Sequence, residues 1–115
     1  MNLPVSRASA PHYHRASVCD GWRLVTAPEL SVIEERVPPG AAEKQHYHRR
    51  ARQFFYVLSG EATLEIEGVE HKLAAGSGLE VPPGVRHKFA NRAAAEVFFL
   101  VISSPATQDD RVDVE

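Results

Sequence analysis

The chain has 115 residues, enough for one compact domain; 43% of them are hydrophobic and 24% are charged. No apolar run approaches the roughly 18 residues that a membrane-spanning helix needs, so the composition predicts a protein that does not cross a membrane. The formal net charge of -2, from 13 Lys and Arg against 15 Asp and Glu, excludes the strongly basic field typical of proteins that bind nucleic acid.

Residues 1–20 are rich in Ser, Ala, Pro and Arg and show no periodicity, which predicts an irregular N-terminal arm. This segment has no apolar core of the signal-peptide type. A single cysteine, Cys19, cannot form an intramolecular disulfide. Together these features favour a reducing, cytoplasmic location.

Residues 21–105 are a succession of short segments rich in β-branched and aromatic residues, separated by Gly and Pro. In "EATLEIEG", Ala62, Leu64 and Ile66 alternate with polar residues, as expected for a strand with one buried face. No segment carries a helical stripe over three turns. The pattern predicts an all-β sandwich, jelly roll or barrel. The charged segment 106–115 fits either a last edge strand or a loose tail.

The tetrapeptide Val-Pro-Pro-Gly occurs twice, at residues 37–40 and 81–84. Proline has no backbone donor for a strand ladder and glycine permits a sharp turn, so each copy is predicted to end a strand and reverse the chain. Each copy is followed by a histidine, His46 after the first and His87 after the second. The repetition predicts two related halves that present side chains to a common place.

The histidines that follow these turns are the candidate metal ligands. His46 and His48 are two residues apart, so in a strand both imidazoles point to the same face. His87 opens the strand after the second turn, and Gln53 lies at the start of "QFFYVLSG". Three imidazoles with one amide oxygen suit a first-row divalent metal and leave positions open for water or substrate.

The strand that carries Gln53 also predicts part of the interior. If Gln53 faces inward, Phe55 and Val57 share its face and form an apolar lining. Exposed structural roles are predicted for the remaining histidines: His12, His14 and His71.

The spacing of these residues resembles the first motif of the cupin family. That motif is a glycine, five residues, His-x-His, three or four residues, a glutamate, six residues and a glycine. Gly40, His46, His48 and Gly60 fall at these places, and Gln53 stands at the glutamate position.

The second cupin motif is a glycine, five residues, Pro-x-Gly, two residues, a histidine, three residues and an asparagine. It is matched in full by Gly76, Pro82, Gly84, His87 and Asn91. Fifteen residues separate the two motifs, as in compact microbial single-domain cupins. The resemblance implies the cupin double-stranded β-helix, a jelly-roll barrel, over residues 21–105. Small cupins of this kind often carry the label mannose-6-phosphate-isomerase-like, which does not establish an activity.

The resemblance also implies a bound metal, which family members usually hold through three His and one Glu. Gln53 departs from this pattern, because an amide oxygen is a neutral and weaker donor than a carboxylate. The bound cation therefore keeps its full charge, which favours an anionic group such as a carboxylate, enolate or phosphate. Arg49, Arg50 and Arg52 are expected to steer such a group towards the site.

Two functions, an enzyme and a binding module, follow from the resemblance, and a metal-free structural barrel is a third reading. The first is a metal-dependent enzyme of the dioxygenase, isomerase or decarboxylase type, which acts on a small anionic or sugar-like substrate in the barrel lumen. The alternative is a non-catalytic module that binds a sugar or small acid with the help of the metal. The expected cofactor is a divalent transition metal, with Mn, Fe, Co, Ni, Cu and Zn not distinguished. No general base is identified among the residues near the motifs: Glu35, Tyr56, Glu80 and Arg86.

The expected partners are a small-molecule ligand or substrate and a second copy of the chain. Cupins commonly cover their unpaired strand edges by forming a homodimer. No nucleic-acid or membrane partner is expected, because no helix-turn-helix pattern and no long apolar segment accompanies the barrel.

Overall fold

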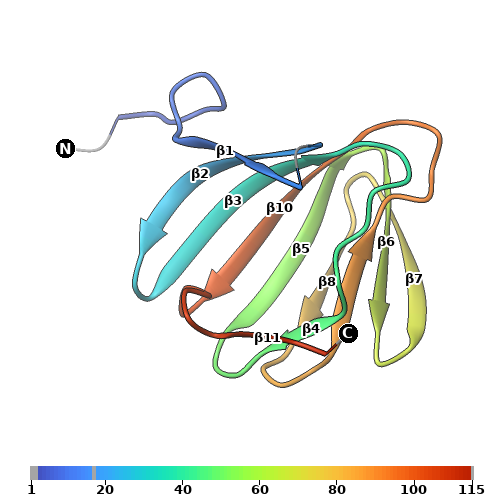
Figure 1. The fold of residues 1–115 in the computed structure, drawn as a ribbon. Helices are drawn as coiled ribbons and strands as arrows, with labels where there is room; N and C mark the ends of the chain where they lie inside the picture. Colours follow the sequence, from blue (N-terminus) through green and yellow to red (C-terminus); the bar gives the residue numbers. More distant parts are fainter. Residues whose placement is uncertain (1–2, 17, 115) are drawn as a thin grey trace.

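The computed structural model describes residues 3–16 and 18–114, and these contain eleven β-strands and no helix (Figure 1). The strands are β1 His12–Arg15, β2 Cys19–Ala27, β3 Leu30–Val37, β4 His46–His48, β5 Arg52–Ser59, β6 Glu61–Ile66, β7 Val69–Ala74, β8 Gly78–Val81, β9 His87–Ala90, β10 Val97–Ser104 and β11 Arg111–Asp113. The all-β class predicted from the sequence is therefore confirmed. In the described part of the chain no helix could span a membrane.

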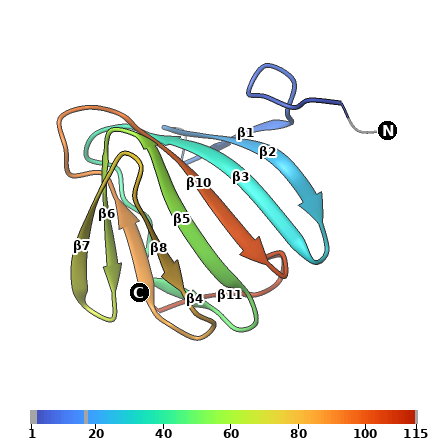
Figure 2. The ribbon, with the colours of Figure 1, turned by 180° about the vertical axis from the view of Figure 1, so that it is seen from behind.

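The strands form two antiparallel sheets. One has six strands in the order β1-β2-β3-β10-β5-β8, and the other has five in the order β11-β4-β9-β6-β7. Figures 1 and 2 show β1, β2 and β3 at one side of the molecule and β6 and β7 at the opposite side. The arrangement is the jelly-roll barrel that the sequence predicts.

The two Pro-Pro-Gly turns bring the candidate ligands together. Gly40 and Gly84 have φ angles of 85° and 79°, in the left-handed region that glycine adopts without a steric penalty. The turns end β3 and β8 and lead to β4 and β9, which pair with each other. In this pairing His46 lies directly opposite His87. Histidines that are 41 residues apart in the sequence are thus cross-strand neighbours.

Strand β5 supplies part of the core in the way the alternation predicts. Gln53, Phe55 and Val57 are all buried, with 6%, 4% and 0% exposure. The ring of Phe55 stacks at 6.0 Å from Phe89 and at 6.1 Å from Phe99, and the last two rings stack at 4.0 Å. These three aromatic side chains line the space between the sheets.

Both ends of the chain contribute strands that frame the interior. The segment 1–20, for which the sequence predicts an irregular arm, contains β1 and the start of β2. A four-residue strand is too short for periodicity to reveal it. Near the C-terminus, β11 pairs with β4 and places Arg111 opposite His48, so residues 106–115 include an edge strand. These short strands bring charged side chains to the interior.

Candidate metal centre

Three buried imidazoles meet between β4 and β9. His46, His48 and His87 are 2%, 6% and 1% exposed. Their ring centroids lie 4.3–5.7 Å apart, and their possible donor atoms all lie within 4.8 Å of one another. Ligands of one transition-metal ion are separated by such distances, so the group can hold a metal.

Backbone carbonyl groups fix the rings of two of these histidines. Nδ1 of His46 lies 2.7 Å from the oxygen of Lys44, and Nδ1 of His87 lies 3.0 Å from the oxygen of Val85. A carbonyl oxygen only accepts, so each Nδ1 carries the hydrogen and each Nε2 keeps its lone pair. Metal-binding histidines are oriented in this way by their outer contacts.

His48 provides a further sign of fit to a cation. Its Nδ1 is buried and has no hydrogen-bond partner among the residues that the structure describes. A buried polar atom without a partner costs free energy, and coordination of a cation would satisfy it.

Gln53 reaches the group from the opposite sheet. Its Nε2 donates to Ser103 Oγ at 3.0 Å, and this bond directs Oε1 towards His87, whose Nε2 is 3.1 Å away. Both of these atoms are acceptors when the ring is neutral and Nδ1 carries the hydrogen. Two acceptors this close repel each other unless a proton or a cation lies between them. The arrangement fits two ligands of one ion.

Burial keeps the imidazoles in the form that binds metals. It lowers the pKa of His46 and of His87, against the opposing effect of their hydrogen bonds to backbone carbonyls. Burial, helped by the two neighbouring imidazoles, lowers the pKa of His48 to about 4. Neutral histidine is therefore favoured at neutral pH, and protons compete weakly with a metal.

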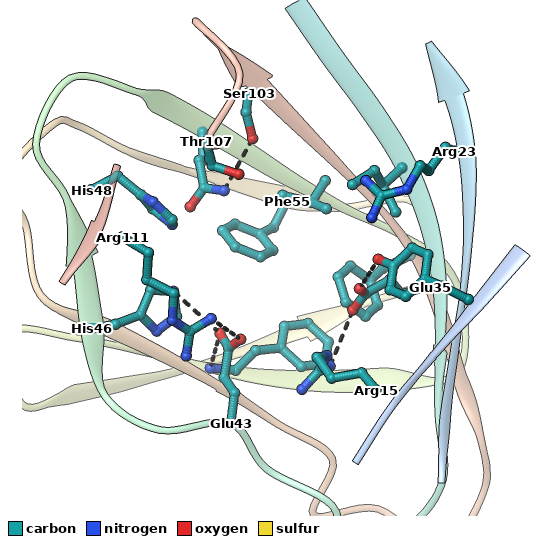
Figure 3. A pocket seen from close by; sticks show the side chains of 16 residues that line it. Arg15, Arg23, Glu35, Glu43, His46, His48, Phe55, Ser103, Thr107 and Arg111 are labelled. Atoms are coloured by element: carbon teal, nitrogen blue, oxygen red, sulfur yellow. Dashed lines mark hydrogen bonds and ion pairs between the residues drawn. The ribbon is translucent and has the colours of Figure 1, made fainter. Parts of the chain in front are cut away.

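His46, His48 and Gln53 line a cavity of about 280 Å³, with His46 and His48 at one end of it (Figure 3). His87 is not among the described residues that line this cavity; it contacts the amide oxygen of Gln53. Phe55 lies in the middle of the cavity, and Phe89 and Phe99, which also line it, stack with Phe55. Charged side chains from β1, β2 and β3 line the part farthest from His46 and His48. The cavity is just below the range of about 300–1,000 Å³ that is common for ligand pockets. It suits a small molecule with an apolar centre and polar ends.

Glu43 is the acidic residue at the metal end, and sequence analysis did not identify it. Its carboxylate accepts a hydrogen bond from the backbone N–H of Phe89 at 3.1 Å and lies 3.9 Å from Nε2 of His46. Arg111 approaches the other carboxylate oxygen to 3.8 Å. Burial raises the pKa of Glu43, against the opposing charges of Arg15 and Arg111. The only sequence signal was a carboxylate three residues before the His-x-His pair.

The residues considered as bases from the sequence lie elsewhere. Glu35 lines the cavity at the end away from His46 and His48 (Figure 3). Glu80 is exposed and pairs with Arg52 at 2.7 Å. Tyr56 and Arg86 are not among the described residues that line this cavity. Glu43 is therefore the better placed carboxylate.

The basic residues expected to steer an anion do not line the cavity either. Arg50 pairs with Asp110 at 3.2 Å, Arg52 pairs with Glu80, and Arg49 is exposed. The arginines that do line the cavity are Arg15, Arg23 and Arg111. They come from the two ends of the chain, which no local pattern connected with the motifs.

A second histidine group lies on the other face of β1. His12 and His14 are exposed, and both approach the same oxygen of Asp20, at 2.8 Å and 3.2 Å. The three possible donor atoms lie within 4.8 Å of one another. Arg36 binds the other oxygen of Asp20 at 2.6 Å. His71 is exposed on β7, as the sequence predicts.

Comparison with known proteins agrees with this fold. Residues 33–103, more than half of the chain, match the family model described as a cupin domain. The chain is 37% identical over 82 residues to Protein SchB of Streptomyces halstedii, and this match covers 69% of this chain and 59% of SchB. It is 34% identical over 80 residues to the polyketide synthase CurC of Streptomyces cyaneus, and this match covers 67% of this chain and 52% of CurC. The matches thus span little more than half the length of these curated relatives.

Among solved structures, the polyketide cyclase RemF from Streptomyces resistomycificus is similar to this chain. The TM-score is 0.85 and the sequence identity is 20%, over 100% of this chain and 87% of that one. At this identity the similarity establishes the shared fold.

Proposed function

This chain belongs to the cupin family, and on that premise we propose that it is a metal-dependent enzyme that closes rings in small polyketide-like molecules bound inside its barrel. The observation that carries the proposal is that His46, His48, His87 and the Gln53 amide oxygen lie close together, and that His46, His48 and Gln53 line an aromatic-lined cavity. Cupins commonly bind both metals and small molecules.

The four side chains are proposed to hold one divalent transition metal. An ion held there would supply Lewis-acid chemistry for a carbonyl or enolate oxygen of the substrate. The set of three neutral imidazoles and one neutral amide adds no negative charge, so an anionic oxygen is a favoured additional ligand. Elemental analysis of the purified protein identifies the metal.

Glu43 is proposed as the residue that moves protons. Its carboxylate lies beside His46, and its buried position favours accepting a proton. In the proposed reaction Glu43 takes a proton from a carbon next to a ketone, and that carbon forms a bond to a second ketone of the same molecule. Glu43 then returns the proton to the resulting alkoxide. Ring closure is balanced without an oxidant or reductant, and later loss of water gives an aromatic ring.

The names of similar proteins support this substrate class. CurC is described as a polyketide synthase and RemF as a polyketide cyclase. Chains of alternating ketones are acidic between their carbonyl groups and close to six-membered rings, which matches a cavity that pairs a Lewis-acid site with a carboxylate.

A synthetic triketone tests the proposal. The metal-loaded protein is incubated with 1-phenylhexane-1,3,5-trione, and formation of 5-phenylresorcinol is followed by chromatography. We expect a rate about 100-fold above that of the same metal in buffer, because a positioned acid–base group contributes on this scale. Glu43→Gln keeps the shape and an oxygen that accepts from Phe89, and should lose this acceleration while retaining the metal.

The same experiment separates an enzyme from a binding module. If the wild-type protein binds metal and triketone but cyclisation proceeds at the buffer rate, the enzyme proposal is wrong and the non-catalytic alternative replaces it. Equal rates for wild type and Glu43→Gln would remove the role proposed for the carboxylate.

The homodimer expected from the family resemblance remains a prediction. It is supported by the place of β1 and β8 at the edges of the six-stranded sheet, where one side of each strand has no neighbour in that sheet within residues 3–16 and 18–114. Size-exclusion chromatography with light-scattering detection tests the homodimer, because it gives the molar mass of the protein in solution. The cytoplasmic location also remains a prediction.

A further inference from the structure

The far end of the cavity holds a polar group with no part in the proposed metal centre. Tyr13 and Arg15 of β1, Arg23 of β2 and Glu35 of β3 line this end. Figure 3 shows Arg15, Arg23 and Glu35 on the side opposite His46 and His48, with Phe55 between the two ends.

Tyr13 is seated there by a glycine on the neighbouring strand. It pairs across the sheet with Gly21, and a Cβ atom at Gly21 would lie only 2.1 Å from Cζ of the Tyr13 ring. The ring therefore lies against the backbone of β2, where no other residue would leave room for it. The guanidinium of Arg23 covers the ring at 4.6 Å from its centroid.

Glu35 joins the members of this group. Its Oε2 accepts a short hydrogen bond from the hydroxyl of Tyr13, and its Oε1 pairs with Arg15 at 3.1 Å. Both carboxylate oxygens are thus engaged by the protein. Burial raises the pKa of Tyr13, so its hydroxyl remains a donor to Glu35. The ion pair with Glu35 therefore holds the guanidinium group of Arg15 in place.

Arg15 retains binding capacity towards a ligand. Its Nε is buried and has no hydrogen-bond partner among the described residues, and a buried donor without an acceptor is costly. The charge of Arg15 also acts on Glu43 at the metal end. The cavity as a whole is lined by three guanidinium groups, of Arg15, Arg23 and Arg111, and two carboxylates, of Glu35 and Glu43, an excess of one positive charge. The position of Arg15 in the cavity lining and the excess of positive charge point to an anionic oxygen as its ligand.

We propose that Arg15, positioned by Glu35 and Tyr13, binds a carboxylate or other anionic oxygen at one end of an aromatic substrate whose opposite end reaches the histidines. This inference rests on the proposed function and narrows its substrate class to acids. Phe55, Phe89 and Phe99 contact the ring system between the two polar ends. The substrate is therefore selected by the distance between its metal-binding oxygen and its acid group.

Calorimetric titration of the zinc-loaded protein with matched catechols tests the inference. The neutral probe is 4-methylcatechol, and the acids, of increasing length, are 3,4-dihydroxybenzoate, 3,4-dihydroxyphenylacetate and 3-(3,4-dihydroxyphenyl)propanoate. The catechol group reports on the metal end, and the carboxylate reports on Arg15. We expect at least one acid to bind about tenfold more tightly than 4-methylcatechol, as charge-assisted hydrogen bonds allow.

Arg15→Gln should abolish the preference for acids and leave the affinity for 4-methylcatechol unchanged. Arg52→Gln removes the same charge outside this cavity and should preserve the preference. If Arg15→Gln does not fold by circular dichroism, Arg15→Lys replaces it; this variant keeps the charge, lacks Nε and should retain only part of the preference.

The inference is overturned if no acid is preferred by the wild type, or if the full preference survives in the Arg15 variant. A wrong assignment of the metal centre gives a different result. In that case the protein holds little zinc and binds 4-methylcatechol weakly, whereas the ratio of acid affinity to 4-methylcatechol affinity still reports on Arg15. Repeating the titrations with zinc-free protein measures the preference for acids independently of the metal.

Discussion

The molecule contains two histidine groups built on the same local plan, and they differ in what surrounds them. In each group a His-x-His pair in a short strand meets a third possible ligand on the paired strand, with donor atoms within 4.8 Å. The first group, His46 with His48 and His87, is buried. The second, His12 and His14 with Asp20, is on the surface.

Outer contacts separate the two groups further. Backbone carbonyls hold Nδ1 of His46 and His87 and leave their Nε2 lone pairs free. In the surface group both rings already contact one oxygen of Asp20, and Arg36 binds the other oxygen. A cation at the surface group would displace these contacts and lie near a guanidinium. The His-x-His spacing alone therefore gives two side chains on one face. Burial, and hydrogen bonds that leave the Nε2 lone pairs free, distinguish the group that is suited to bind a metal.

The largest expected effect is loss of the metal when a buried histidine is removed. His46→Ala or His87→Ala should lower metal affinity by at least about 100-fold, because only two imidazoles and the weaker amide oxygen of Gln53 then remain to hold the ion. The double variant His12→Ala, His14→Ala should keep one metal per chain. Elemental analysis after dialysis gives the stoichiometry, and circular dichroism checks folding.

The opposite pattern, with metal retained in both buried-group variants and lost in the surface-group variant, would reverse the assignment. His71→Ala is the control for loss of an exposed imidazole.

The second expected effect is a loss of stability of the metal-free protein in acid. His48 has a pKa of about 4 in the folded chain and an ordinary value of 6.5, so the unfolded chain binds more protons between these values. The free energy of unfolding therefore falls as pH drops from 6.5 to 4. His48 alone contributes up to about 3 kcal/mol to this change.

Urea unfolding in the presence of EDTA at pH 7 and pH 4.5 measures this change. In His48→Gln the difference between the two pH values should shrink. An unchanged difference would mean that His48 is as easily protonated in the folded chain as in the unfolded one. Because burial lowers all three pKa values, a bound metal should also be retained below pH 6.5.

The smallest expected effect is a gain of affinity at the amide ligand. Gln53→Glu replaces a neutral oxygen with a charged one close to His87 and should tighten metal binding by about tenfold, as a favourable charge interaction of about 1.4 kcal/mol gives. Competition with a chelating dye measures the affinity. Gln108→Glu makes the same chemical change at an exposed position and should have no effect. Equal affinities for wild type and Gln53→Glu would show that residue 53 does not contact the ion.

Much of the buried group was predictable because its information is local. The repeated Pro-Pro-Gly turns, the alternation in "QFFYVLSG" and the His-x-His spacing each depend on a few consecutive residues. These patterns predicted the all-β fold, the shared face of Gln53, Phe55 and Val57, and the histidines that meet in the barrel. The comparison with the surface group shows the limit of such patterns, since His12 and His14 have the same spacing.

The sequence by itself determined where β3 and β8 end and which residues of β5 share one face, because those properties follow from backbone geometry and from the period of two. Only the tertiary structure decided that Arg15 meets Glu35, that Arg111 meets Glu43 and that both arginines enter the cavity. Arg15 and Arg111 lie in the short terminal strands, which are ordered by pairing with distant segments. Contacts of this kind depend on sheet order and register, which no local pattern encodes.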